Sequence, residues 1–254
     1  MKLESLPNEL LLDLFKYFST VQLLRSFNDL NSRFNNLLFH DFRDYHLDFR
    51  SISRDNFKIL CQQYLPVIID QVSSLRLAND DDDSPQQIDL FFSHVSSTDD
   101  NADYDLQILL NEAHCLYSLE ITSWPSSLIP LVKNTSKSVR RLDLRQLTIC
   151  HQQDSNSSSR TQNYRKFGCS RLGIQCEILR IATESEADIL ALVDTMTNIR
   201  VLYTTCTSDI WKYADNVSSS KKFEFIELLK SSLPSTSIIT RVSGLYGFLQ
   251  LWFR

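Results

Sequence analysis

The amino-acid sequence of 254 residues predicts an α/β protein in which three short helices precede a parallel sheet built from strand–helix units. Two observations support this fold class. Apolar residues recur at helical spacing through roughly the first forty residues, which is typical of amphipathic helices. Five later segments share one short template of alternating leucine and polar residues, and helical patterns separate them, which favours parallel strands joined by helices.

The first 42 residues predict three short helices separated by polar breaks at residues 19–20 and 28–32. Ser5 is suited to cap the first helix, and Pro7 is tolerated in a first turn because that position donates no intrahelical hydrogen bond. The apolar positions are Leu10, Leu11, Leu14, Phe15 and Phe18, then Leu23, Leu24 and Phe27, then Phe34, Leu37 and Leu38. Helices of about ten residues cannot enclose so many large side chains, so we expect part of this surface to meet the rest of the chain or another protein.

The pattern Leu-Pro-x-Glu-Leu-Leu-x-x-Leu-Phe-x-x-Phe over residues 6–18, followed by a Leu-Leu pair and then Phe34, resembles an F-box. The F-box is a three-helix module that docks on a Skp-type adaptor in cullin-based ubiquitin ligases. Phe18 and Phe34 depart from the leucine and tryptophan that are frequent in the family, and both keep an apolar group. The resemblance implies that the adaptor-binding and module-packing residues are Leu6, Pro7, Leu10, Leu14, Phe15, Leu23, Leu24 and Phe34. The alternative is an ordinary helical cap packed on the following domain.

Residues 43–254 contain five copies of a strand-like template, at 72–77, 116–121, 139–144, 176–181 and 199–204. Their central leucines, at positions 75, 119, 142, 179 and 202, are 44, 23, 37 and 23 residues apart. Leu47 marks a weaker copy 28 residues before Leu75. Intervals of about 20 to 29 residues are typical of leucine-rich repeats, and the interval of 44 indicates a further degenerate unit near residues 88–95.

Helical patterns lie between these strands, at residues 57–69, 103–113, 126–132, 187–196 and 222–233. A strand–helix unit cannot bury its apolar face alone, so stacked units form a continuous core with a parallel sheet on one side. This part of the chain therefore resembles an irregular leucine-rich-repeat solenoid with a parallel curved sheet. A helix-bearing α/β domain of another topology is the alternative.

Two polar insertions and a different ending interrupt the repeats. Residues 79–84 hold four successive aspartates, and residues 151–163 are rich in Ser, Gln and Asn. We expect both to be solvated, irregular loops, because neither can bury enough apolar area to offset the entropy of ordering. Apolar residues at 238–239 and 249–253 flank a turn-rich stretch and predict a closing hairpin.

The composition excludes several classes of function. The net charge of -5 argues against a general nucleic-acid surface, and no apolar run approaches the roughly 18 residues that a membrane helix needs. Only four glycines occur, so there is no glycine-rich phosphate loop, and the scattered cysteines match no familiar zinc pattern. We therefore expect no catalytic residues, no metal and no cofactor, and a cytoplasmic or nuclear protein.

The resemblance implies a substrate-recognition subunit of a Skp-cullin-F-box ubiquitin ligase that acts in ubiquitin-dependent protein degradation. The first helices would dock on the Skp-type adaptor, and the repeat domain would hold an unidentified target protein. The polar positions of the strands, which alternate with the leucines, are the candidates for contact with the target. They are Ser74, Arg76, Ser118, Glu120, Arg141, Asp143 and Arg180. A non-catalytic scaffold that acts without the cullin is the alternative function.

Overall fold

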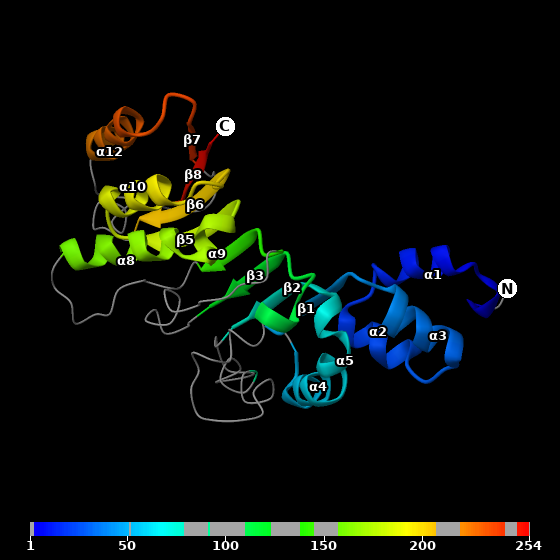
Figure 1. Cartoon of the computed structure of the whole chain (residues 1–254). Helices are drawn as coiled ribbons and strands as arrows, with labels where there is room; N and C mark the ends of the chain where they lie inside the picture. Colours follow the sequence, from blue (N-terminus) through cyan, green and yellow to red (C-terminus); the bar gives the residue numbers. More distant parts are fainter. Residues whose placement is uncertain are drawn as a thin grey trace. The chain divides into compact units, whose positions relative to one another are not determined.

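The structure is a computed structural model that describes residues 3–50, 52–78, 91, 110–122, 138–144, 157–206, 219–241 and 248–253 (Figure 1). Within these residues, the strands form one eight-stranded sheet in the order β1 (Tyr45–Asp48), β2 (Val72–Leu77), β3 (Ser118–Ile121), β4 (Arg141–Leu144), β5 (Ile178–Thr183), β6 (Val201–Cys206), β8 (Phe248–Trp252) and β7 (Ile238–Arg241). The chain divides into two compact units, Met1–Leu119 and Glu120–Arg254. The prediction of an α/β fold with a mostly parallel sheet is confirmed.

The first unit opens with the three predicted helices. A 3-10 turn, η1 (Leu3–Ser5), precedes α1 (Asn8–Phe15), so Pro7 and not Ser5 occupies the cap position. Helix α2 (Thr20–Phe27) begins with a reciprocal capping box between Ser19 and Gln22. Helix α3 (Ser32–Asn36) is capped by Asn31 and continues as a π-helical turn, η2 (Leu37–Asp41).

These helices share a core with the first strand. The Tyr45 hydroxyl donates to the Leu38 carbonyl at 2.9 Å, and the Thr20 hydroxyl donates to the His46 carbonyl at 2.7 Å. The rings of Phe42 and Tyr45 meet edge to face with centroids 4.9 Å apart. The boundary that the sequence suggests after residue 42 therefore lies inside a compact unit.

Strands β1 (Tyr45–Asp48) and β2 (Val72–Leu77) are parallel, and Leu47 lies opposite Leu75. The weaker copy predicted around Leu47 is thus a strand. A helical run joins the two strands through α4 (Arg54–Ile59), a π-helical turn η3 (Leu60–Tyr64), α5 (Leu65–Ile68) and η4 (Ile69–Gln71). The π-turn ends just before Pro66, which lacks the N–H that a regular helix would require.

Four further strands also coincide with predicted ones: β3 (Ser118–Ile121), β4 (Arg141–Leu144), β5 (Ile178–Thr183) and β6 (Val201–Cys206). In the second unit β4, β5 and β6 are parallel neighbours, as predicted. The register places Leu142 opposite Leu179 and Leu179 opposite Leu202. The central leucines of the template therefore form a continuous buried ladder.

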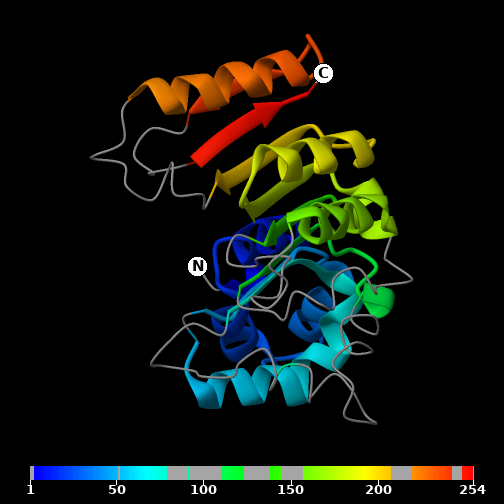
Figure 2. The same cartoon turned by 90° about the vertical axis from the view of Figure 1, so that its left-hand side faces the viewer.

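Helices α8 (Ser157–Cys169), α9 (Arg171–Gln175), α10 (Glu186–Thr195) and α12 (Ser219–Ser232) belong to the second unit. Figure 2 shows α8, α10 and α12 side by side along one face of the sheet. Tyr164 and Phe167 of α8 and Leu192 of α10 are fully buried. The predicted helices at 187–196 and 222–233 are confirmed.

Helix α8 corrects one prediction. The polar stretch at residues 151–163 was expected to be an irregular loop, but residues from Ser157 onward are helical. The first turn is polar, so the stretch resembles a loop when read alone. The helix is stabilised by its second half, where Tyr164 is buried and its hydroxyl donates to the Ala182 carbonyl at 2.9 Å.

The predicted closing hairpin is confirmed in β7 (Ile238–Arg241) and β8 (Phe248–Trp252), which are antiparallel. Strand β8 also pairs antiparallel with β6. The sheet is therefore parallel from β4 to β6 and antiparallel at this end.

Several predictions lie outside the described residues. These are the aspartate run at 80–83, the degenerate unit at 88–95 apart from Phe91, the helix at 126–132 and most of the helix at 103–113. Among the helices that the structure describes, none combines the length and hydropathy needed to cross a membrane.

Candidate functional site

The outer side of α1 carries exposed apolar side chains. Leu10 is 53% exposed, and Tyr17, just beyond the helix, is 87% exposed. Pro7 is exposed and Leu14 is half-buried. These four positions recur at intervals of three and four residues, so they follow one side of the helical segment. We call Pro7, Leu10, Leu14 and Tyr17 the α1 apolar row.

Half of the predicted adaptor-binding set lies on the opposite, inner side. Phe15, Leu23, Leu24 and Phe34 are at most 1% exposed. Phe27 joins the two phenylalanines, with ring centroids 5.0 Å from Phe15 and 5.5 Å from Phe34. These four residues therefore pack the module itself and cannot contact an adaptor without unfolding it. Among the predicted set, Leu6, Pro7, Leu10 and Leu14 retain accessible surface.

Arg33 of α3 holds the segment that leads into α1. Its guanidinium donates to the Glu4 carbonyl at 2.6 Å, to the Leu6 carbonyl at 2.5 Å and to Asn8 Oδ1 at 2.6 and 2.8 Å. This one side chain thus holds Glu4 and Leu6, which precede Pro7, and Asn8, which follows it. We therefore expect Arg33 to help position the α1 apolar row.

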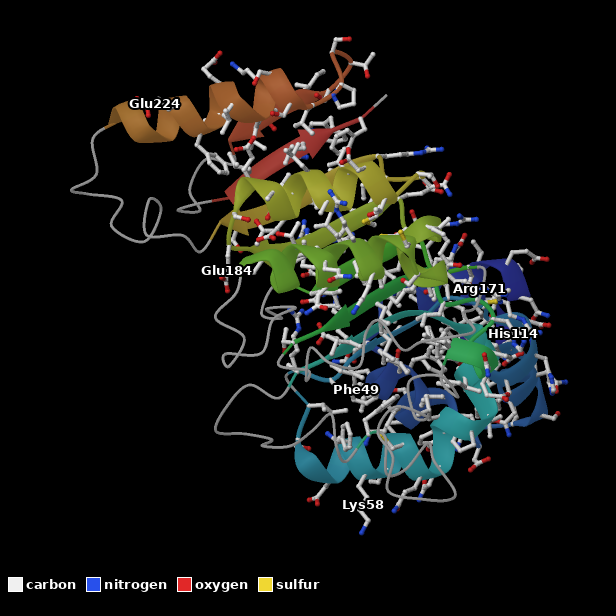
Figure 3. All side chains as sticks on the ribbon, turned by 60° about the vertical axis from the view of Figure 1, so that its left-hand side comes forward. Phe49, Lys58, His114, Arg171, Glu184 and Glu224 are labelled. Carbon is white, nitrogen blue, oxygen red and sulfur yellow. The ribbon has the colours of Figure 1, made fainter. Side chains whose placement is uncertain are left out.

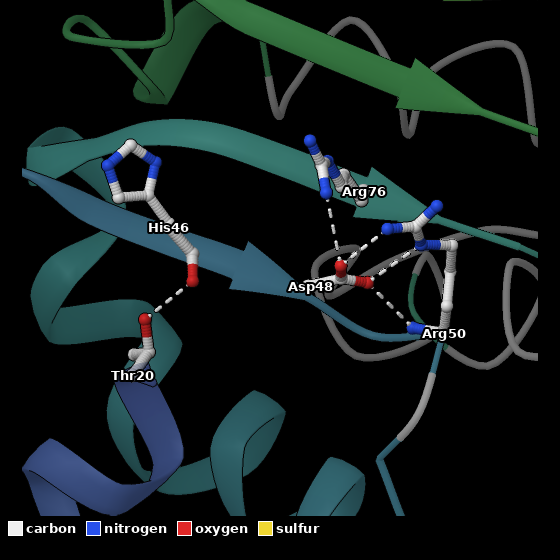
Figure 4. Close-up of polar contacts among 5 residues, drawn as sticks. All are labelled: Thr20, His46, Asp48, Arg50 and Arg76. Atoms are coloured by element: carbon white, nitrogen blue, oxygen red, sulfur yellow. Dashed lines mark hydrogen bonds and ion pairs between the residues drawn. The ribbon is translucent and has the colours of Figure 1, made fainter. Parts of the chain in front are cut away.

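The first unit also presents polar strand positions on the side of β1 and β2 opposite the leucines. The register pairs His46 with Ser74 and Asp48 with Arg76. Figure 4 shows Asp48 between two arginines: Arg50 Nη2 is 2.7 Å and Arg76 Nη1 is 3.3 Å from Asp48 Oδ2. Ser74, Arg76 and Ser118 are all half-buried.

The pKa of the Asp48 carboxyl reflects this arrangement. Burial raises its pKa, but the hydrogen bonds and charge of Arg50, together with a hydrogen bond from Arg76, outweigh burial and hold the pKa below its ordinary value. Arg76, a predicted target-binding residue, is therefore already engaged with a carboxylate that stays ionised at neutral pH.

A cavity of about 440 Å³ lies beside these strands, between α2, β1 and α4. Arg25, His46 and Asn56 are among its polar lining residues. Nearby, Figure 3 shows Lys58 of α4 pointing away from the protein, whereas Phe49 lies inside against Phe57, with ring centroids 5.0 Å apart. Within the described part of the chain, no group of three or more His, Cys, Asp or Glu side chains could hold a metal ion.

In the second unit, a polar ladder crosses the sheet on the face opposite the leucines. The register aligns Asp143, Arg180, Tyr203 and Gln250 on β4, β5, β6 and β8. Arg180 Nη1 is 3.5 Å from Asp143 Oδ2, and the Arg180 guanidinium lies 4.5 Å from the centre of the Tyr203 ring. Gln250 Nε2 donates to the Tyr203 hydroxyl at 3.0 Å. These contacts hold the four side chains of the ladder in place before any ligand binds.

Two predicted target-binding residues are not accessible. Glu120 is 6% and Asp143 is 3% exposed, so the expectation of an outward, solvated row is wrong at these positions. The Arg180 guanidinium is one of the groups that lie against Asp143. Arg141 and Arg180 are half-buried and keep accessible surface.

The sequence did not single out three of these side chains: Tyr17 in the α1 apolar row, Arg33 beside it, and Trp252 in β8. Tyr17 continues the spacing of Leu10 and Leu14, and its exposure could have been suspected from that spacing. Trp252 alternates with the buried Leu251, so the period of two in the hairpin was the available signal. Arg33 carried no signal, because its partners are backbone carbonyls and Asn8, distant in sequence.

The buried cysteines are not poised for chemistry. Burial raises the pKa of the Cys61 thiol to about 12, and burial also raises that of Cys176 to about 12, so neither forms a thiolate at neutral pH. Cys115 and Cys169 are exposed. This agrees with structural roles for the two buried thiols.

No protein-family model matches the chain, and no curated protein matches its sequence. The surfaces that bear on function are therefore the α1 apolar row and the faces of the sheet.

Proposed function

We propose that this protein is the substrate-recognition subunit of a Skp-cullin-F-box ubiquitin ligase. The α1 apolar row docks on the Skp-type adaptor, and the later strands hold the target protein. The chain itself performs no covalent chemistry. It accelerates modification by holding the target near a separate enzyme, which raises the effective concentration of the reacting groups.

The observation that carries the proposal is the division of the F-box-like pattern into a buried half and an exposed half. Phe15, Leu23, Leu24 and Phe34 are buried on the inner side of the helical segment, together with Leu11 and Phe27. Leu10 and Tyr17 are therefore not needed to fill the core. Large apolar side chains that remain exposed in a row are typical of a protein-interaction surface.

The test is a comparison of two leucines. Leu10 lies at the centre of the α1 apolar row, and Leu30, in the turn between α2 and α3, is similarly exposed. We expect Leu10→Ala to weaken binding of a purified Skp-type adaptor by on the order of 2 kcal/mol, or about 30-fold, because central contact residues dominate interface energies. Leu30→Ala should leave the affinity unchanged.

Isothermal titration of the full chain with the adaptor, accompanied by melting curves of both variants, provides the measurement. Failure of the wild-type chain to bind any Skp-type adaptor rejects the proposal, as does equal binding by the two variants. Co-purification of a cullin with the bound adaptor supports the ligase. An adaptor complex that never contains a cullin supports the alternative, a non-catalytic scaffold.

A further inference from the structure

The face of the second unit opposite its helices carries an apolar row beside the polar ladder. Trp252 of β8 and Ile238 of β7 lie directly opposite each other and are 43% and 45% exposed. Val201 of β6 lies opposite Trp252 but is only 6% exposed, and Ile178 of β5, opposite Val201, is half-buried, so Trp252 and Ile238 supply most of the accessible apolar surface. Leu179, Leu202 and Leu251 are buried on the helix side, so these alternate residues belong to the other face.

Arg141 and Arg180 lie at the far end of this apolar row, beside the buried Asp143 that pairs with Arg180. Arg141 of β4 lies opposite Ile178 and is half-buried, and within the described residues it forms no ion pair. Arg180, in the next row, has a buried Nε atom without a hydrogen-bond partner in the described part of the chain. Residues 120–254 contain 17 Lys and Arg against 12 Asp and Glu, whereas residues 1–119 contain 9 against 19.

The edge beside Arg141 is positive as well. Glu177 lies between Arg140 and Arg200, with its carboxylate oxygens 3.8 Å from Arg140 Nε and 3.4 Å from Arg200 Nε. Two arginines therefore share one carboxylate at the start of these strands. A ligand that carries negative charge complements this end of the face, and a basic ligand is repelled from it.

The two ends of the face have a defined separation. Arg141 lies on β4 and Trp252 on β8, three strand spacings apart in the sheet. Neighbouring strands are about 4.8 Å apart, so the separation is about 14 Å. An extended chain covers about 14 Å in roughly four residues. Trp, Tyr and Arg, the residue types that dominate interface energies, all occur on this face.

We propose that this face binds an extended segment of the target protein that carries an aromatic or branched apolar side chain and, about four residues away, a carboxylate. The apolar side chain packs on Trp252 and Ile238, and the carboxylate pairs with Arg141 and Arg180. This inference rests on the proposed function, because it assigns the segment to the target that the ligase modifies.

A phage-displayed library of random eight-residue peptides, selected on the immobilised full chain, tests the inference. We expect the recovered peptides to be enriched in an acidic residue and an aromatic or branched apolar residue about four positions apart. Trp252→Ala should reduce the recovery of these peptides at least 10-fold. Arg141→Glu should shift the preference from acidic to basic residues.

Matched controls lie on α12 of the same unit, where Leu228 is exposed and Lys230 is about half-exposed. Leu228→Ala and Lys230→Glu should leave the selected peptides unchanged. The inference is overturned by peptides without acidic enrichment, by enrichment that survives both face variants, or by an equal loss in the α12 variants. If no such peptides are selected although the chain binds the adaptor, this inference is wrong and the proposed function is unaffected. If the expected peptides are selected but the chain binds no adaptor, the proposed function is wrong instead.

Discussion

Neighbouring residues of the first helix have opposite roles. Leu10 is exposed and Leu11 is fully buried, and Leu14 is half-buried beside the fully buried Phe15. Successive residues of an α-helix are rotated by about 100°, so a pair of adjacent apolar residues cannot face one side equally. This rotation separates the surface that folds the segment from the surface left for a partner.

Arg33 connects this exposed surface to the rest of the first unit. Replacing Arg33 with methionine removes its hydrogen bonds to the segment before α1 but keeps much of the side-chain volume. We expect Arg33→Met to reduce the free energy of unfolding by about 1 to 2 kcal/mol and to weaken adaptor binding. Urea unfolding and titration with the adaptor measure the two effects.

Arg25 offers the matched control, since it is exposed and its side chain has no hydrogen bond or ion pair within the described residues. Arg25→Met should change neither quantity. Normal adaptor affinity in a folded Arg33→Met variant would show that Arg33 does not position the α1 apolar row.

At the scale of elements, helices α8 and α10 pack closely because Gly168 has no side chain. A Cβ atom at position 168 would lie 2.8 Å from Thr195 Cβ and closer still to its hydroxyl oxygen. Real side chains do not approach so closely, so the two helices must separate if residue 168 is enlarged.

We expect Gly168→Ala to lower the free energy of unfolding by about 1 to 3 kcal/mol. Thr195→Ala removes the hydroxyl that meets the new methyl group, so the double variant should recover part of the loss. A double-mutant cycle measured by urea unfolding yields this coupling. Strictly additive effects would contradict direct contact between the two positions.

The pairing of β1 with β2 makes stability depend on pH through Asp48. The folded-state pKa of Asp48 lies below the unfolded value of about 3.9, so the stabilising contribution is present above that value. It is lost as the pH falls through the folded-state pKa. Asp48→Asn should therefore destabilise the protein at pH 7 and have a smaller effect at pH 3.

Unfolding free energies of the wild type and Asp48→Asn at both pH values test this direction. Asp13, an exposed carboxylate that pairs with Lys16, provides a comparison, and Asp13→Asn should have little effect at either pH. An effect of Asp48→Asn that grows toward pH 3 would show that the sign is wrong.

At the scale of the whole molecule, stability depends on buried leucines that lie opposite one another in successive strands. Leu142, Leu179 and Leu202 are fully buried and in register across β4, β5 and β6. Because interiors are closely packed, removing one member leaves a cavity that its neighbours cannot fill. The repeating template in the sequence thus corresponds to one continuous core.

Leu202→Ala should reduce the free energy of unfolding by about 2 to 5 kcal/mol, as is typical of buried leucines. Leu228→Ala, at an exposed position on α12, should change it by less than about 0.5 kcal/mol. Urea unfolding of the two variants makes the comparison. Similar losses in both would contradict the described burial.

The sequence by itself determined the local elements of this protein. The three first helices, the strands around the central leucines, two of the helices that cover the sheet and the closing hairpin were all predicted, because apolar periodicity is a local property of the chain. Helix α8 was not predicted, because its polar first turn resembles a loop and its stability comes from Tyr164 and Phe167 packing in the core.

Only the tertiary structure decided which residues remain available for a partner. Phe15 and Leu10 follow the same apolar pattern, yet one is buried and the other exposed. Asp143 alternates with leucines like any solvent-facing strand residue, yet it is buried and paired with Arg180, 37 residues later in the chain. Whether a side chain is buried depends on which residues, distant in the sequence, pack against it. The periodicity of one segment contains no information about those residues.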